Sequence, residues 1–250
     1  MTIASIAPIT IAPSTIITAD RLAGLPAPVR RYLETTGVVG APWIETARIR
    51  YSGRFRLAAD KPWMPIRARQ VYTTNPPAFR WQARFKLAGL WIMSGDDTYR
   101  GGHGHMFGKI AGLFTVFDAR GPELDQGTML RYLNEMTWFP TAFLGDNITW
   151  QGVDDHSADV TFTDAGKSVT ARLHFDEAGR LTDFVTQRYR ENKGNYTLDT
   201  WSTPMTKYAT MAGLSLPVRG QAVWKLPDGD LPYADLEIEA IEYNVPVEPF

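Results

Sequence analysis

Apolar and polar residues alternate along several segments of the first hundred residues. In the segment 48–57 the two faces are composed of Ile49, Tyr51, Phe55 and Leu57 on one side and Arg48, Arg50, Arg54 and Arg56 on the other. The segments 66–72 and 79–86 repeat this pattern, again with aromatic residues opposite arginines. A period of two is typical of a strand with one buried face. The pattern therefore predicts strands that share an aromatic inner face and a basic outer face.

Strand patterns also fill much of the rest of the chain. The segment 169–175 alternates cleanly between two turn signals, Asp164-Ala165-Gly166 and Asp176-Glu177-Ala178-Gly179. Further strands are predicted at 196–202, 207–211, 218–226 and 233–243. The glycine-rich stretch 90–118 is less regular and predicts two or three short strands around bends. Together these segments amount to about ten strands.

Two helices are predicted among the strands. The segment LPAPVRRYLETTG places Pro28 in a first helical turn and Gly37 at the end, where a helix commonly stops. A longer helix begins after Gly121, because Pro122 suits its first turn and acidic residues follow near the positive end of the helix dipole. Apolar residues at 130, 133 and 136 give this helix one buried stripe.

These elements predict a mainly β (α+β) protein, with one curved antiparallel sheet or half-barrel of about ten strands and a helical lid. A sheet of that many twisted strands tends to curl, and helices then cover its open side. Residues 19–250 are expected to form a single ligand-binding domain, and residues 1–18 an extended or disordered arm. The arm has no Lys or Arg and contains Pro8 and Pro13, so neither a signal peptide nor a membrane span is predicted and a cytoplasmic location is expected.

The inward aromatic and apolar residues are candidate ligand contacts, with an ordinary packed core as the alternative. This candidate set consists of Tyr51, Phe55, Tyr72, Phe79, Trp81, Phe85, Met129, Leu133, Trp138, Arg188, Trp201 and Trp224. Arg188 belongs to it because it shares a strand face with Phe184. An inward arginine needs an acidic partner, for which Asp118, Glu123 and Glu135 are candidates, or else binds a carboxylate or phosphate.

The second predicted helix carries the candidate catalytic residues. Arg131 and Glu135 lie one turn apart, a spacing that usually decorates a solvated helix face. If the helix closes a pocket instead, Glu135 or Asp125 would act as acid or base, and Arg131 or Tyr132 would stabilise negative charge. Both interpretations remain open from sequence.

Other chemistry receives less support. His103 and His105 have a spacing that can chelate a metal, and Asp96 and Asp97 could complete such a site. Two histidines without a fixed third ligand are nevertheless weak evidence for a metal site. The sequence contains no cysteine, no Walker loop and no dinucleotide fingerprint, so no cofactor is predicted. The formal net charge is -1. The basic outer face is a candidate for contact with an anionic membrane. Asp235, Glu237 and Glu239 point outward on the last strand and instead favour a solvated face whose charges are partly paired. The absence of interleaved aromatics on this face argues against nucleic acid.

Several segments carry a family resemblance: LPAPVRRYLETTGVVG, PWMPIRARQVYTTNPPAFRW, DARGPELDQGTMLRYLNEMTWFPTAFL, HFDEAGRLTDF and VWKLPDGDLPY. As a set they resemble an uncharacterised bacterial domain family of unknown function. That family is similar to the LolA and LppX type of lipoprotein carrier, in which a curved antiparallel sheet and a helical lid enclose a lipid-sized cavity. The resemblance implies the same fold and supplies no catalytic residues.

Three functional hypotheses follow. The first is binding or carriage of a hydrophobic small molecule or lipid between sheet and helix. The second is a cofactor-independent hydrolase, isomerase or cyclase that uses Glu135 and Arg131 in the same cavity. The third is a scaffold that meets a membrane through its basic face. The sequence does not decide the ligand or the oligomeric state.

Overall fold

The computed structural model describes residues 15–192 and 194–247, and within them fourteen strands form one antiparallel sheet. The strands are β1 (Thr46–Phe55), β2 (Met64–Thr74), β3 (Pro77–Leu87), β4 (Leu90–Arg100), β5 (His103–Ile110), β6 (Phe114–Ala119), β7 (Ile148–Asp154), β8 (Ser157–Asp164), β9 (Lys167–Phe175), β10 (Leu181–Asn192), β11 (Asn195–Ser202), β12 (Met205–Met211), β13 (Leu214–Leu226) and β14 (Gly229–Tyr243). The predicted fold class is confirmed. The predicted count of about ten strands is too low. One of the strands that were not predicted, β7, is largely exposed and shows little alternation.

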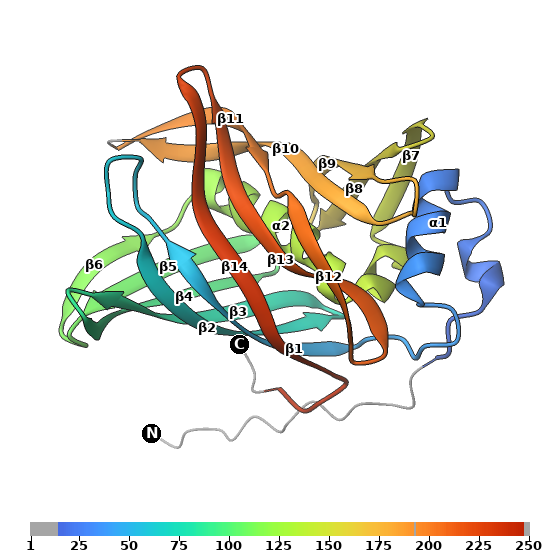
Figure 1. The fold of residues 1–250 in the computed structure, drawn as a ribbon, viewed down its shortest axis with the longest axis horizontal. Helices are drawn as coiled ribbons and strands as arrows, with labels where there is room; N and C mark the ends of the chain where they lie inside the picture. Colours follow the sequence, from blue (N-terminus) through green and yellow to red (C-terminus); the bar gives the residue numbers. More distant parts are fainter. Residues whose placement is uncertain (1–14, 193, 248–250) are drawn as a thin grey trace.

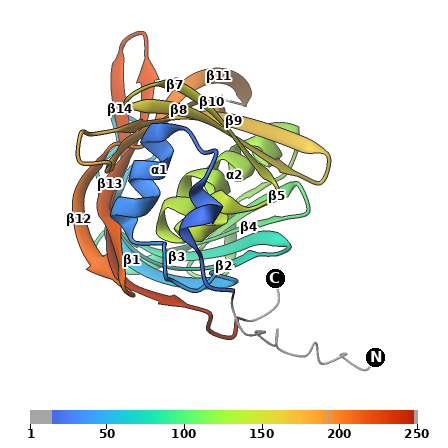
Figure 2. The same cartoon turned by 90° about the vertical axis from the view of Figure 1, so that its right-hand side faces the viewer.

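The sheet runs in the order β6-β5-β4-β3-β2-β1-β14-β13-β11-β10-β9-β8-β7, and β12 pairs with β13 off this path. It therefore has free edges at β6 and β7, and it curves between them so that its inner side surrounds the interior of the molecule (Figures 1 and 2). The register places Arg50 opposite Arg69 and Tyr51 opposite Ala68, so the arginines and the aromatic residues of β1 occupy opposite faces, as predicted.

Helix α2 (Pro122–Glu135) lies inside the curve of the sheet, as the end-on view in Figure 2 shows. It packs against β4 and β5 on one side and against β9 and β10 on the other. Helix α1 (Ala27–Thr36) packs against β7, β8 and β13 and ends at Gly37, whose left-handed φ of 86° favours glycine. Short 3-10 turns η1 (Ala19–Leu22), η2 (Met136–Trp138) and η3 (Pro140–Leu144) complete the helical part.

The two halves of the sheet also meet at one corner, which we call the corner contact. The β4–β5 turn and the β8–β9 turn meet there through side chains: Tyr99 donates to Asp164 at 2.6 Å, and Lys167 donates to the Gly102 carbonyl at 2.7 Å. Lys167 also pairs with Asp125 of α2 at 2.8 Å. Side chains and the helix therefore join these two parts of the molecule at the corner.

Five hairpin turns lie at one end of the sheet, which we call the hairpin end. They join β1 to β2, β3 to β4, β5 to β6, β10 to β11 and β13 to β14. Large exposed apolar residues gather on these hairpins: Leu57, Leu87, Leu90, Leu113, Phe114, Val116, Tyr189, Tyr196 and Leu198. Leu57 was expected on the inner face of β1. That prediction is wrong, because β1 ends at Phe55 and Leu57 lies in the following turn.

The amino-terminal arm is described only from Thr15. Residues 1–14 of the arm predicted over residues 1–18 lie outside the described residues. Residues 15–17 run beside the segment 40–43: the Ile17 amide donates to the Ala41 carbonyl at 2.9 Å, and the Ile17 side chain is buried. The last residues of the predicted arm are thus attached to the folded domain.

Candidate functional site

A buried polar cluster joins α2 to the inner face of β1–β4. Arg131 forms its centre: its Nε donates to Glu135 at 2.8 Å, and its two terminal nitrogens donate to Asp97 at 2.7 Å and Gln70 at 3.0 Å. Gln70 in turn donates to the second Glu135 oxygen at 2.7 Å, and the Tyr72 hydroxyl donates to that same oxygen at 3.1 Å. We call these five residues the Arg131 cluster. The pair at 131 and 135 thus lies in the interior and not on a solvated helix face.

Burial and charge act against each other in the Arg131 cluster. Burial alone would lower the pKa of Arg131, but Glu135 and Asp97 hold that pKa well above its ordinary value. Burial also raises the pKa of Asp97 to about 6, although Arg131 acts to lower it. Burial together with the charge of Glu135 raises the pKa of the Tyr72 hydroxyl. Asp97 is therefore a carboxyl group that can take up a proton close to neutral pH.

The carboxylates of Glu135 and Asp97 differ in how many of their oxygens accept hydrogen bonds. Both Glu135 oxygens accept hydrogen bonds from described residues, so the expected general base is fully occupied. Asp97 binds Arg131 through Oδ2, while its buried Oδ1 has no partner among the described residues. A base needs a free lone pair within reach of a proton. By this criterion Asp97 suits acid–base work better than Glu135.

Arg188 forms a second inward site, on β10. Its guanidinium lies 4.6 Å from the ring centre of Trp201 and 5.8 Å from that of Trp224, and one terminal nitrogen is 3.4 Å from the Tyr233 hydroxyl. Gly127 of α2 also lies close to the guanidinium: a Cβ atom at this position would be 3.2 Å from Arg188 Nε. We call the arginine and its three aromatic neighbours the Arg188 cage.

The expected acidic partner of Arg188 is not found. Among the described residues no carboxylate forms an ion pair with it, so the predicted pairing with Asp118, Glu123 or Glu135 is wrong. Glu135 is taken by Arg131, and Asp118 pairs with His105. The Nε of Arg188 is buried and has no acceptor among the described residues. The inward direction predicted for Arg188 agrees with these contacts.

A continuous row of aromatic rings connects the two arginines. Trp224 stacks on Tyr233 at 6.1 Å, Tyr233 contacts Phe55 at 5.6 Å, Phe55 contacts Phe85 at 5.6 Å, and Phe85 contacts Trp81 at 6.1 Å. Arg131 lies 5.0 Å from the Trp81 ring centre. With Trp201, we call these rings the aromatic belt. Phe55 and Tyr233 are only half-buried, whereas the other rings of the belt are buried.

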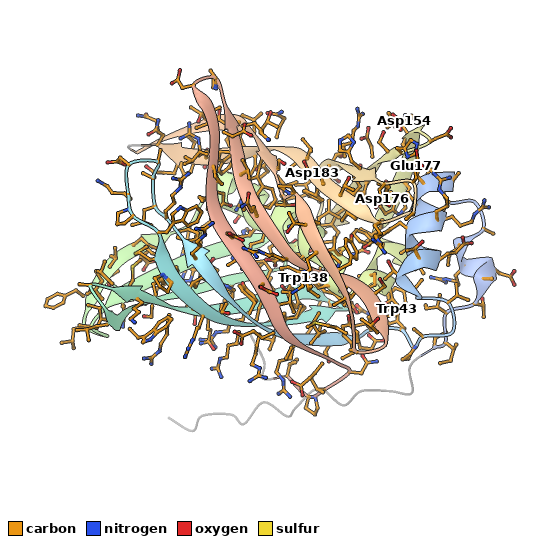
Figure 3. The ribbon with its side chains drawn as sticks, viewed as in Figure 1. Trp43, Trp138, Asp154, Asp176, Glu177 and Asp183 are labelled. Carbon is orange, nitrogen blue, oxygen red and sulfur yellow. The ribbon has the colours of Figure 1, made fainter. Side chains whose placement is uncertain are left out.

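The remaining predicted ligand contacts pack against one another and the helix. Tyr72 and Phe139 have ring centres 4.6 Å apart, and Phe79 stacks on Tyr99 at 6.2 Å. Met129 and Leu133 are fully buried on α2. Trp138, labelled in Figure 3, donates to the Pro217 carbonyl at 3.1 Å, and its ring centre is 6.1 Å from that of Tyr51. In this part of the interior the side chains form a packed core.

Two other candidates on α2 lie outside the Arg131 cluster. Asp125 accepts hydrogen bonds from Lys167 and the Gly104 amide, both at 2.8 Å, and it contacts His103 at 3.1 Å. Burial would raise the pKa of Asp125, but these bonds hold it below its ordinary value. The Tyr132 hydroxyl donates to the Thr73 carbonyl at 2.8 Å. These contacts tie α2 to the sheet.

The two histidines bind different carboxylates. His103 contacts Asp125, and His105 contacts Asp118 at 2.8 Å. Within the described residues no group of three or more His, Asp or Glu side chains is arranged to hold a metal ion. The structure thus brings no third ligand to the pair at 103 and 105.

The outer face of β1–β5 contains a groove of about 650 Å³, which we call the outer groove. Its lining consists of Arg50, Tyr51, Arg67, Ala68, Arg69, Gln82, Ala83, Arg84, Ser94, Gly95, Asp96, Phe107 and Glu239. Figure 3 shows nitrogen-tipped side chains extending from β1–β4 away from α2. Aromatic residues were not expected on this face, and that expectation is wrong: Trp63 lies against Arg54 and Arg56, and Trp91 against Arg67.

The family assignment agrees with the resemblance noted from sequence. The profile of a family of unknown function, DUF6544, matches residues 15–236. The chain belongs to this family. No curated protein matches it.

Three solved structures have a similar arrangement. A LolA superfamily protein from Nitrosomonas europaea matches with a TM-score of 0.47 at 10% identity, covering 92% of this chain and 94% of its own. A putative outer membrane lipoprotein-sorting protein domain from Vibrio parahaemolyticus gives 0.48 at 8% identity, covering 83% and 88%. A DUF1329 family protein from Desulfovibrio piger gives 0.42 at 9% identity, covering 88% and 92%. At these TM-scores the matches carry no functional assignment.

No helix within the described residues has the length and apolar character needed to cross a bilayer. The cytoplasmic location expected from sequence stays a prediction.

Sequence reasoning missed three residues of the site. Gln70 lies in phase with Ala68 and Tyr72 on β2, so its burial follows from the pattern already recognised there. Asp97 was considered only as a metal ligand, but it lies in phase with buried Tyr99 on β4. Tyr233 begins a segment recognised as a strand, and its contact with Arg188 depends on distant strands that meet only in the folded sheet.

Proposed function

We propose that this protein binds, and carries, an amphipathic molecule that has an apolar body and one anionic group, such as a fatty acid or another acidic lipid. The Arg188 cage is the observation that supports this proposal. A guanidinium surrounded by two indole rings and a phenol, without a carboxylate among the described residues, is suited to an anion supplied from outside. The anionic group would bind at Arg188, and the apolar body would lie along the aromatic belt.

The cost of leaving Arg188 unpaired supports an anionic ligand. A buried charge or donor without a partner is unfavourable, and Arg188 Nε is both buried and without an acceptor. A carboxylate or phosphate oxygen can satisfy Nε and a terminal nitrogen together in a bidentate contact. The rings of Trp201 and Trp224 partly compensate the charge through cation–π contact, so the empty site can persist in the folded protein.

The aromatic belt supports an apolar body for the ligand. Phe55 and Tyr233 are half-buried, so their rings still offer apolar surface to a bound molecule. Burial of apolar surface contributes roughly 25 cal/mol per Å², so about 200 Å² of contact would contribute on the order of 5 kcal/mol. This contribution is sufficient for binding only when an anchor such as Arg188 also fixes the position of the ligand.

The hairpin end offers the ligand a route to the belt. Phe55 lies at the last residue of β1, and Tyr233 lies near the start of β14, so this part of the belt is next to the hairpin turns. Leu113 and Phe114 at these turns are 79% and 70% exposed. An apolar molecule that arrives from a membrane or a partner would meet apolar side chains first.

The proposal is tested by native mass spectrometry followed by binding measurements. Protein purified from its producing cells should carry a discrete acidic amphiphile that denaturation releases. Tryptophan fluorescence should then report binding of palmitic acid, with hexadecanol as the matched uncharged ligand. We expect Arg188→Gln to weaken binding of the acid at least tenfold and leave the alcohol unchanged.

Arg190→Gln is the matched control, because Arg190 is on the same strand but already pairs with Asp199 at 2.7 Å. Equal loss of acid binding in both variants would contradict the assignment of the anionic group to Arg188. Protein that carries no amphiphile and shows no fluorescence change with either ligand would overturn the proposed function.

A second candidate function is cofactor-independent acid–base catalysis on the same ligand. Asp97 supports it, because its pKa is raised to about 6 and its Oδ1 is free of described partners. Incubation of the released amphiphile with fresh protein would show turnover as a change in mass. Activity that follows the protonation of Asp97 and disappears in Asp97→Asn would establish catalysis, whereas unchanged ligand would leave binding alone.

A further inference from the structure

The outer groove contains two pairs of directly opposed arginines. In the sheet register Arg50 lies opposite Arg69 across β1 and β2, and Arg67 lies opposite Arg84 across β2 and β3. All four arginines line the groove. Like charges directly opposite each other on one face of a sheet destabilise it, because their Cβ atoms are roughly 5 Å apart. Two such pairs side by side are therefore an unfavourable arrangement in the absence of a counter-ion.

None of these four arginines forms an ion pair with a carboxylate of the described residues. Arg69 donates instead to the neutral side chain of Gln82 at 2.8 Å, and Arg67 lies over the ring of Trp91. The groove lining includes two acidic residues. Asp96 is already bound by Arg80 at 2.8 Å and by Gln82 at 3.0 Å. Glu239 is the second, so one carboxylate faces four arginines.

Several other arginines of the outer face show the opposite behaviour. Arg48 pairs with Glu242 through two hydrogen bonds of 2.8 and 3.0 Å. Asp235 accepts from both Arg54 and Arg219. The acidic residues of β14 thus neutralise the basic rows on either side, as the sequence predicts, but not in the groove. The four arginines without an acidic partner thus coincide with the hollow in the surface.

From this coincidence we infer that the outer groove binds a soluble molecule with two phosphate groups, one held by each opposed arginine pair. A guanidinium group can donate two parallel hydrogen bonds to the oxygens of one phosphate. The two arginine pairs therefore provide two guanidinium groups for each of two phosphates. Arg67 and Arg69 are two residues apart on β2, so their Cα atoms are roughly 7 Å apart. Their long, flexible side chains can converge on the two neighbouring phosphates of a diphosphate or extend to the more widely spaced phosphates of a bisphosphate. A volume of about 650 Å³ lies in the range of small-molecule sites. This site is on the opposite face from the aromatic belt and is independent of the proposed function.

Titration calorimetry with pyrophosphate tests the inference, with orthophosphate as the singly phosphorylated comparison. We expect pyrophosphate to bind at least tenfold more tightly than orthophosphate, and the affinity to fall as salt is added. The double variant Arg67→Gln/Arg84→Gln should lose at least tenfold in pyrophosphate affinity. Its melting temperature without ligand should equal or exceed that of the wild type, because one like-charge contact is removed.

The control removes the same number of charges elsewhere. Arg30 is on α1 and Arg172 is on β9, both outside the groove lining, so Arg30→Gln/Arg172→Gln should keep the wild-type affinity for pyrophosphate. Equal losses in both double variants would overturn the inference, because they would show a response to net charge alone. Equal affinity for orthophosphate and pyrophosphate would also overturn it.

A lipid surface is the other source of paired phosphates, and co-sedimentation separates the two. Vesicles of phosphatidylglycerol are compared with vesicles of phosphatidylcholine. We expect at most weak sedimentation with either and none that depends on Arg67 and Arg84. Strong sedimentation with phosphatidylglycerol that the double variant abolishes, without pyrophosphate binding in solution, would overturn the inference in favour of membrane contact.

Discussion

Arg131 and Arg188 both point into the interior of this protein, and their charges are balanced in different ways. Arg131 donates to two carboxylates and a glutamine within 3.0 Å. Arg188 meets aromatic rings and one phenolic oxygen, and no carboxylate of the described residues pairs with it. Arg131 therefore stabilises the folded structure, because without it the carboxylates of Asp97 and Glu135 would be buried without a counter-ion. Arg188 can bind an anion from outside the protein. This difference distinguishes a polar cluster that stabilises the fold from a candidate binding site.

Removal of the charge at Arg131 is expected to have the largest effect. Arg131→Leu leaves Asp97 and Glu135 buried without their counter-ion, and breaking a buried pair in this way costs about 3–5 kcal/mol. Urea unfolding followed by circular dichroism would measure the loss of unfolding free energy. A change below about 1 kcal/mol would show that water screens the cluster and that the two arginines differ less than their contacts suggest.

The pH dependence of Asp97 gives the next largest effect. Burial raises its pKa to about 6 in the folded protein, so the folded state holds this proton more tightly than the unfolded state does. The stabilisation is present below pH 4 and is lost as the pH rises through 6, which amounts to on the order of 3 kcal/mol. The stability of the wild type relative to Asp97→Asn should fall across this window. A stability difference that stays constant from below pH 4 to above pH 6 would contradict the raised pKa of Asp97.

A smaller effect is expected from the hydroxyl of Tyr72. Tyr72→Phe removes one donor to Glu135 and retains the ring that packs on Phe139, so we expect a loss of about 1–2 kcal/mol in unfolding free energy. The thermal unfolding midpoint would measure it. If the midpoint were unchanged, Glu135 would be held by Arg131 and Gln70 alone.

The smallest stability effect is expected at Arg188. Arg188→Leu removes cation–π contacts but strands no carboxylate of the described residues, so the unfolding free energy should change by less than about 1 kcal/mol. Differential scanning calorimetry on ligand-free protein would test this. A loss comparable to that of Arg131→Leu would mean that Arg188 is a structural residue and would remove the contrast between the two sites.

Much of the fold could be predicted because the period-two pattern is local. The segment 48–55 is an example, since arginines occupy positions 48, 50 and 54 while Ile49, Tyr51 and Phe55 occupy positions of the opposite phase. The helix after Gly121 likewise follows from Pro122 and the acidic residues of its first turn. The edge strand β7 shows no such alternation because most of its residues face solvent, so the period-two pattern could not predict this strand.

The site was only partly predictable, because its partners come from distant strands. The spacing of Arg131 and Glu135 on one helix was visible in the sequence, but the contacts of Arg131 with Gln70 and Asp97 depend on how β2 and β4 face α2. The missing partner of Arg188 was unpredictable for the same reason. The expected ion pair could be excluded only in the folded structure, where no carboxylate of the described residues pairs with Arg188 and two of the three candidates, Glu135 and Asp118, pair with other residues.

The corner contact gives the sheet an uneven mechanical stiffness. Along the ladder, neighbouring strands such as β2 and β3 are held by main-chain hydrogen bonds over their whole length. At the corner, the Tyr99–Asp164 and Lys167–Gly102 bonds and the Lys167–Asp125 pair are contacts made by flexible side chains. Separation at the corner would break a few side-chain contacts and leave the strand pairing intact. The corner is therefore more compliant than the hydrogen-bonded strand ladder, and the two turns can move apart without loss of strand pairing.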